Sequence, residues 1–213
     1  TVYDMPALAS VVMPEMESIT QLSVQRAGLS ALALRATHNI DSIVVSECPA
    51  IETVSLPDAT GGTFTQHLGV EVTECPLLHD LVFTSVEDVS LDLENLPSLQ
   101  SLSAFSAIRK VNSQMKIVSS GVSNLSALSG ATISGPIDLE DLPALTTLEG
   151  LDGLALALPD EPSSTSLTLR SLPSLSSVSG ADGAAVGSID FEDLPLVERL
   201  PAFALPIQGL DLI

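Results

Sequence analysis

Residues 91–97 read LDLENLP, and the same frame returns as IDLEDLP at 137–143 and as IDFEDLP at 189–195. In each copy two apolar residues flank an acidic one, two polar residues follow, and a further apolar residue precedes proline. The alternation of apolar and polar residues predicts a short strand whose apolar side chains face inward. Proline has no N–H to donate, so we expect each strand to end just before it.

The frame recurs along the whole chain. Its second strand residue marks each copy, and the markers lie 21 to 24 residues apart, except for two gaps of 27 and 30. The markers are Val2, Val24, Val45, Val72, Leu93, Ile117, Leu139, Leu169, Phe191 and Leu212. Such a period predicts a solenoid in which equal positions of successive copies stack. We therefore expect an all-β fold, a right-handed β-solenoid or leucine-rich-repeat-like coil of about nine to ten levels with parallel sheets.

Composition agrees with a thin coil. Hydrophobic residues make up 45% of the 213 residues but aromatic ones only 3%, so Leu, Val, Ile and Ala must build the core. The net charge of −20 argues against nucleic acid or an anionic membrane as partner. No apolar run is long enough to predict a membrane span in this segment. We expect a single solenoid domain over residues 1–213 that is a fragment of a longer array, with a processed N-terminus before Thr1.

The units VVSECPAIETVSLP and LDLENLPSLQSLSAFSAIRKV resemble the receptor L-domain repeat of insulin and growth-factor receptor ectodomains and of fungal cell-wall proteins. They are also similar to the BspA-like leucine-rich repeats of microbial surface proteins. The resemblance covers nearly the whole chain and implies an extracellular, cell-surface or cell-wall location with a binding or wall-related role. It implies no catalytic residue. The position after the strand favours an L-domain-like coil over a helix-backed horseshoe, because it holds no asparagine: Met5, Ala27, Cys48, Cys75, Leu96, Ser120, Leu142, Leu172 and Leu194.

Cys48 and Cys75 occupy the same motif position in consecutive copies. Stacking would place their Cα atoms about 5 Å apart, inside the range of roughly 4.4 to 6.8 Å that a disulfide tolerates. Two interpretations stay open: a bridge formed in an oxidising compartment, or two small buried hydrophobic residues. With two cysteines and no matching histidine, we predict no zinc site.

Carboxylates are paired on the outward face of three strands: Asp92 with Glu94, Asp138 with Glu140, and Asp190 with Glu192. Such pairs are candidates for ligand binding or for Ca²⁺, which prefers oxygen ligands. Lys116 and Arg170 lie in the intervening copies, so we favour cross-strand ion pairs and predict no cofactor, with Ca²⁺ as the alternative. Glu47 and Glu74 stack without a cation in their column and are weaker metal candidates. A bound cation would relieve the repulsion between their carboxylates, and so would a neighbour such as Arg26.

Two insertions lengthen otherwise regular copies, at residues 59–69 and 154–166. Loops inserted along one edge of a repeat protein often carry binding residues. The alternative is that the fold tolerates the two longer loops and that they have no binding role. The contact candidates here are Phe64, His67, Leu154 and Leu156. Asn124 begins the sequon Asn-Leu-Ser, a candidate glycosylation site if the chain is secreted.

No nucleophile elbow, dinucleotide-binding or phosphate-loop motif occurs, and the three histidines share no column, so we predict no enzymatic activity. We expect an extracellular or cell-surface repeat domain that presents a binding or adhesion surface for a protein or glycan. The alternative is a structural solenoid segment of a wall, coat or filament. In that case the partners are further copies of the chain, because both ends finish inside a repeat.

Overall fold

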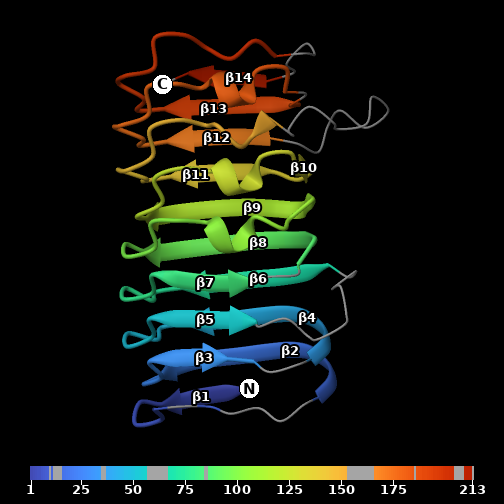
Figure 1. Ribbon diagram of the computed structural model, residues 1–213. Coiled ribbons are helices and arrows are strands. Elements are labelled where there is room, and N and C mark those ends of the chain that lie inside the picture. Colours follow the sequence, from blue (N-terminus) through green and yellow to red (C-terminus); the bar gives the residue numbers. More distant parts are fainter. Residues whose placement is uncertain are drawn as a thin grey trace.

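A computed structural model describes residues 1–9, 11, 16–34, 37–56, 67–83, 86–152, 166–184, 186–203 and 209–212. These residues form an all-β solenoid of stacked parallel strands, and no α-helix occurs among them. Figure 1 shows the strands as rungs of one stack, with the two termini at opposite ends.

A long parallel sheet forms one wall of the solenoid. Its strands follow in the order β1 (Val2–Met5), β2 (Met16–Ala27), β4 (Thr37–Ser46), β6 (Leu68–Thr73), β8 (Asp88–Leu96), β9 (Lys110–Ser120), β11 (Ile137–Glu140), β12 (Ser166–Arg170), β13 (Ser188–Glu192) and β14 (Gly209–Leu212), while β10 (Thr132–Ile133) pairs with β9. Every strand therefore meets the next repeat of its own sequence, as the frame predicts.

The register of the long sheet confirms the marker positions. Val2 pairs with Val24, Val24 with Val45, and every later marker through Leu212 pairs with the next, although β8 and β9 shift register between Val89 and Leu91. The markers from Val24 to Leu169 are fully buried. Since a shift of one residue would turn every buried side chain to water, burial of one face fixes this register.

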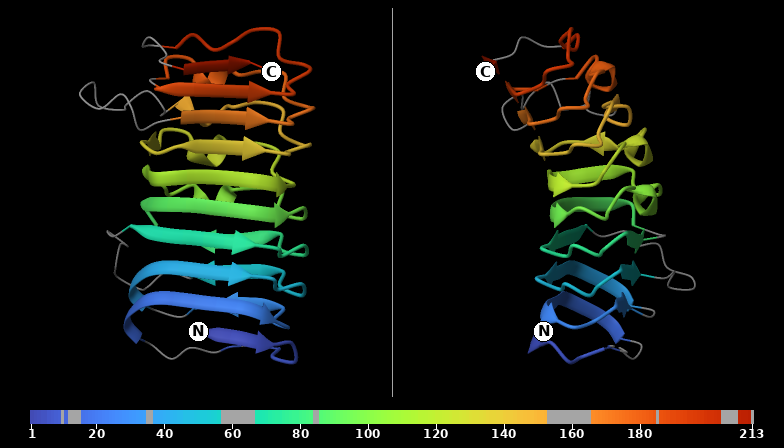
Figure 2. Two further views of the ribbon diagram at one scale, coloured as in Figure 1. Left: turned by 180° about the vertical axis from the view of Figure 1, so that it is seen from behind. Right: turned by 90° about the vertical axis from the view of Figure 1, so that its left-hand side faces the viewer.

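The opposite wall is shorter and less regular. It begins as a second parallel sheet of β3 (Ala31–Ala33), β5 (Thr53–Leu56) and β7 (Asp80–Phe83), and later levels have 3₁₀ turns instead: η1 (Ser103–Phe105), η2 (Ser126–Leu128) and η4 (Ser179–Ala181). The right-hand view of Figure 2 shows the long sheet on one side and these shorter elements on the other. Between the walls lies one continuous core of Leu, Val and Ile, with Phe83 and Phe105 stacked at 5.2 Å between ring centroids.

In nine successive levels a non-glycine residue with positive φ lies at the C-terminal end of the strand in the long sheet or directly after it. The column comprises Asp4, Arg26, Glu47, Glu74, Asn95, Ser119, Asp141, Ser171 and Asp193, with φ between 49° and 56°. Asp and Asn tolerate this left-handed conformation better than other residues with a side chain, which explains their frequency here. The turn directs the following residue back into the core.

That following residue is buried in most levels, as predicted, with two exceptions: Met5 is exposed, and Leu194 is only partly buried. Met5 is 50% exposed, because in the part of the chain that the structure describes only β2 packs beside β1. Leu96, Leu142 and Leu172 are fully buried, and Ser120 holds the same position with 2% exposure.

Replacing Ser120 with alanine is expected to stabilise the fold by about 1 kcal/mol or more, because the Ser120 hydroxyl is buried without a hydrogen-bond partner among the described residues. Urea denaturation followed by circular dichroism measures this change. The exposed Ser106→Ala is the control and should alter the free energy of unfolding by less than about 0.5 kcal/mol. Equal effects of both substitutions would contradict the prediction.

Candidate functional site

The outward face of the long sheet carries two neighbouring columns of polar and charged residues. The first runs through Glu71, Asp92, Lys116, Asp138, Thr168, Asp190 and Asp211, and the second through Thr73, Glu94, Val118, Glu140, Arg170 and Glu192. The six carboxylates singled out in the sequence all lie here and are half-buried. The structure thus brings the three predicted pairs onto one face.

Cross-strand ion pairs link these columns, as the sequence predicts. The Lys116 ammonium donates a hydrogen bond to Glu94 on the neighbouring strand, and the Arg170 guanidinium donates one to Asp190. The Arg170 Nε atom also lies 3.5 Å from Oε2 of Glu192. Among the described residues, no such ion pair forms at Asp92 or Asp138, which leaves these two carboxylates less well compensated.

Asp92 and Asp138 flank Lys116 in the first column, and one oxygen of each, Oδ1, is buried without a hydrogen-bond partner among the described residues. Burial raises the pKa of both carboxyl groups above the ordinary 3.8. The Lys116 charge opposes that rise at Asp92, and the Arg170 and Lys116 charges oppose it at Asp138. At Asp92 the neighbouring Glu94 and Glu71 carboxylates raise the pKa further. The ionised face is therefore under electrostatic strain that a positively charged or hydrogen-bond-donating ligand would relieve.

The raised pKa values predict an unusual acid response. A carboxyl whose folded-state pKa exceeds its unfolded value takes up protons first in the folded chain, so its contribution to stability grows as the pH falls from neutral toward 3.8. The double variant Asp92→Asn/Asp138→Asn should remove that part of the pH dependence. At pH 7 we expect it to be more stable than the unchanged protein by less than about 1 kcal/mol, because water reaches both side chains and screens them. Urea midpoints between pH 4 and pH 7 test this, and an unchanged pH slope would contradict it.

A shallow hollow of about 290 Å³ opens on the same face, over β4, β6, β8 and β9; we call it the sheet hollow. It is lined by Ser42, Gly69, Val70, Glu71, Ser90, Leu91, Asp92, Ser113 and Gln114. Its floor is low because Ser42, Gly69 and Ser90 are register partners, so three small residues stack where other columns carry longer side chains. Glu71 and Asp92 form one rim, and Ser113 and Gln114 the other.

No protein-family model, curated protein or solved structure matches the chain. The similarity to L-domain repeats consequently stays a prediction, and the function must be argued from the surface itself. In the part of the chain that is described, no helix has the length and apolar character needed to cross a membrane.

A second, wider depression of about 750 Å³ lies beside the sheet hollow, where the strands turn; we call it the corner hollow. It is lined by Ser46, Glu47, Pro49, Glu71, Thr73, Glu74 and Pro76. Glu71 lines both depressions, so together they form a continuous polar surface along β6. Four carboxylates border it: those of Glu47, Glu71, Glu74 and Asp92.

One carboxylate of the stacked pair Glu47 and Glu74 has a hydrogen-bond donor that the sequence did not suggest. Asn95, the next residue in the turn column, donates a hydrogen bond of 2.8 Å to Oε1 of Glu74. The Arg26 guanidinium stacks over the Tyr3 ring at 4.4 Å, and its Nε atom lies 3.8 Å from Oδ1 of Asp4. No cluster of three or more His, Cys, Asp or Glu suited to a metal ion occurs within the described ranges.

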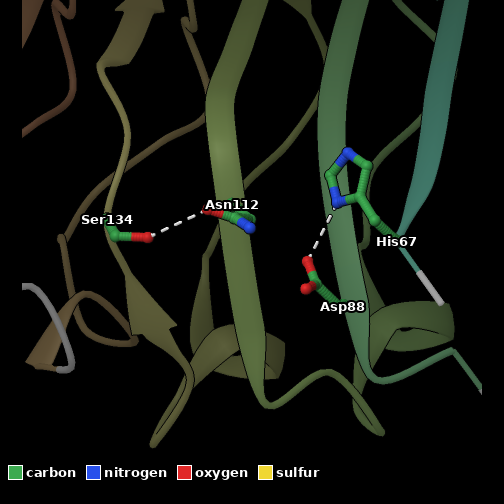
Figure 3. Close-up of polar contacts among 4 residues, drawn as sticks. All are labelled: His67, Asp88, Asn112 and Ser134. Carbon is green, nitrogen blue, oxygen red and sulfur yellow. Dashed lines mark hydrogen bonds and ion pairs between the residues drawn. The ribbon is translucent and has the colours of Figure 1, made fainter. Parts of the chain in front are cut away.

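His67 is the one loop candidate that the structure describes. Its Nδ1 atom lies 3.0 Å from Oδ1 of Asp88, which begins the next strand, and both side chains are partly buried. Figure 3 shows this pair and, one and two levels further on, Asn112 with Ser134, whose hydroxyl lies 3.4 Å from Oδ1 of Asn112. These contacts join successive levels at the edge where the strands begin, so His67 supports the base of the first insertion.

The remaining candidates divide between described and undescribed residues. Phe64, Leu154 and Leu156 lie outside the described residues. Asn124 is half-buried and accepts a hydrogen bond of 2.7 Å from the Ser126 hydroxyl within its own sequon. Cys48 and Cys75 are both buried free thiols.

The sequence contains a signal for the floor of the sheet hollow, although the predicted binding residues did not include it. Ser42, Gly69 and Ser90 each lie three residues before a marker in consecutive copies, so their stacking follows from the period. The opposite rim has no such signal. Ser113 and Gln114 reach the hollow because β9 contains a register shift opposite β8, and Ser113 has a φ of 79° there.

Proposed function

We propose that this chain is an extracellular or cell-surface repeat domain whose long sheet presents a binding surface for a protein or glycan ligand. The observation that supports this most directly is the sheet hollow, a depression with a small-residue floor and carboxylate rim on an otherwise continuous strand face. We assign the chain a binding role and no reaction. We further infer that the solenoid is right-handed, that each strand of the long sheet is one of its nine to ten levels, and that it is of the L-domain type.

The chemistry of the hollow defines the ligand it suits. A floor of Ser42, Gly69 and Ser90 leaves room for one inserted side chain or the edge of a sugar ring. Carboxylate oxygens of Glu71 and Asp92 at the rim accept hydrogen bonds, so a ligand rich in hydroxyl or N–H donors is favoured. The net charge of −20 disfavours anionic polymers.

Filling the hollow tests the proposal. A Cβ atom added at Gly69 would lie 3.6 Å from the Asp41 carbonyl oxygen and 3.7 Å from Ser42 Cβ, which are ordinary contacts. Gly69→Arg should therefore fold normally while its side chain occupies the depression. We expect the unchanged protein to bind at least one member of a glycan array or a synthetic peptide array, and Gly69→Arg to weaken that binding at least about tenfold, the loss expected of a blocked pocket.

Ser106→Arg is the matched control, because it adds the same charge to an exposed position on the opposite wall, just after η1 and away from the long sheet. It should leave binding unchanged. The proposed binding surface is rejected if neither array contains a ligand, or if the two arginine variants weaken binding equally. The location is tested separately by antibody labelling of intact source cells, which should reach the protein without permeabilisation.

A further inference from the structure

Cys48 and Cys75 lie side by side in consecutive levels of the coil. Ser46 and Thr73 are register partners, and each lies two residues before one of the cysteines. The Glu47 amide donates a hydrogen bond of 3.0 Å to the Thr73 carbonyl, so the pairing continues past the strand ends. Both side chains are fully buried and point into the core. Neighbouring strands are spaced about 4.8 Å apart, within the Cα separations of roughly 4.4 to 6.8 Å found in disulfides.

The two thiols also interact with each other. Each thiol shifts the pKa of the other: the pKa of Cys48 falls to about 7 and that of Cys75 rises, because a protonated thiol stabilises a neighbouring thiolate. Each thiol also faces a backbone carbonyl, Cys48 that of Ser46 at 3.3 Å and Cys75 that of Thr73 at 3.3 Å. These two contacts are alike because the cysteines hold the same position in the repeat, and Cys48 Sγ lies in addition 3.8 Å from the Val24 carbonyl oxygen.

We propose that Cys48 and Cys75, which are free thiols in this structure, become oxidised to an intrachain disulfide that fastens one level of the solenoid to the next. The bond closes a segment that contains β5 and the whole insertion at residues 59–69, the point at which the spacing of the markers widens to 27 residues. Because a longer segment costs more entropy to close, a covalent link is expected to stabilise this level more than it would a level of 21 to 24 residues.

Formation of the bond needs an oxidant, which is a small-molecule or protein disulfide. The thiolate of one cysteine attacks that disulfide, gives a mixed disulfide and releases one thiolate. The second cysteine then loses its proton, attacks the mixed disulfide and releases the other thiolate. Two protein thiols thus lose two electrons and two protons, and the oxidant gains them as two thiols. Since both sulfur atoms are buried in the finished fold, the exchange takes place as the two levels assemble.

The test compares how strongly the folded and unfolded chains favour the bond. The full chain is refolded from about 8 M urea, enough to unfold a domain of this size, into glutathione buffers of graded redox ratio, and a second series stays in urea. After acid quenching and N-ethylmaleimide labelling, mass spectrometry counts free thiols. We expect an effective thiol concentration on the order of 100-fold higher in the folded chain, equivalent to about 2.7 kcal/mol. A ratio below about tenfold would overturn the proposal, as would a stable glutathione adduct in place of the intrachain bond.

A second measurement does not depend on labelling. The urea midpoint of the unchanged protein should fall when dithiothreitol is added, whereas that of Cys48→Ala/Cys75→Ala should not respond. Should this double variant fail to fold, the single variants Cys48→Ala and Cys75→Ala serve instead, since either one removes the bond but keeps one thiol. A midpoint of the unchanged protein that ignores dithiothreitol would overturn the proposal. Neither experiment involves a ligand, so the outcome is independent of the proposed binding function.

Discussion

Leu139→Ala is expected to lower the free energy of unfolding by about 2 to 5 kcal/mol. Leu139 is fully buried on β11 and is the register partner of Ile117 on one side and Leu169 on the other. In a solenoid each level contacts only its neighbours, so a cavity at one level weakens two interfaces at once. Urea denaturation monitored by circular dichroism gives the measurement.

Leu77→Ala provides the matched control, because the same side-chain atoms are removed where the leucine is 51% exposed. Its cost should stay below about 1 kcal/mol, since little apolar surface is returned to water. Similar losses at Leu77 and Leu139 would mean that the stacked apolar column is not the source of stability.

Gly150→Ala is the second large effect, with an expected loss of about 3 kcal/mol or more from strain and overpacking combined. Gly150 has a φ of 108°, and a Cβ atom there would lie 2.0 Å from the carbonyl oxygen of Leu125 in the adjacent level. The atoms that this Cβ would meet are backbone atoms of Leu125 and Ser126, so no flexible side chain can move aside. The turns of the two levels would have to separate.

Gly130→Ala separates these two causes. Gly130 also has a positive φ, 78°, but a Cβ atom added there meets nothing within 4 Å. Only the backbone conformation is then penalised, and we expect a loss of about 1 to 2 kcal/mol. If both alanine variants unfold at the same urea concentration, close stacking of the turns does not limit the fold.

The stacking register could be predicted from the sequence because it depends on a local pattern that is repeated. The spacing of Val24, Val45 and Val72 alone implied that these residues pair, and they do. The same logic placed Lys116 between Asp92 and Asp138, and the carboxylate pairs on one face. The predicted burial of Met5 fails because an inward side chain is covered only where a level packs on each side of it.

The opposite wall could not be placed in advance. Strand β7 and the turn η1 occupy this wall in consecutive levels, yet both segments carry apolar residues at short spacing, as Leu81 and Phe83 in one and Leu102 and Phe105 in the other. Short segments of this kind carry too few residues for a period of two to be distinguished from a turn.

The order of residues was enough to specify the β-solenoid, its parallel register and the inward and outward faces, because each level repeats one alternation of apolar and polar residues. The folded chain was needed to see which outward side chains meet: Asn95 with Glu74, His67 with Asp88, and Ser113 and Gln114 with the rim of the sheet hollow. Those contacts arise between residues of neighbouring levels whose side-chain directions depend on a local bulge, a turn conformation or the end of an insertion. A repeat period specifies which residues lie in adjacent levels, but the backbone at each level decides whether they touch.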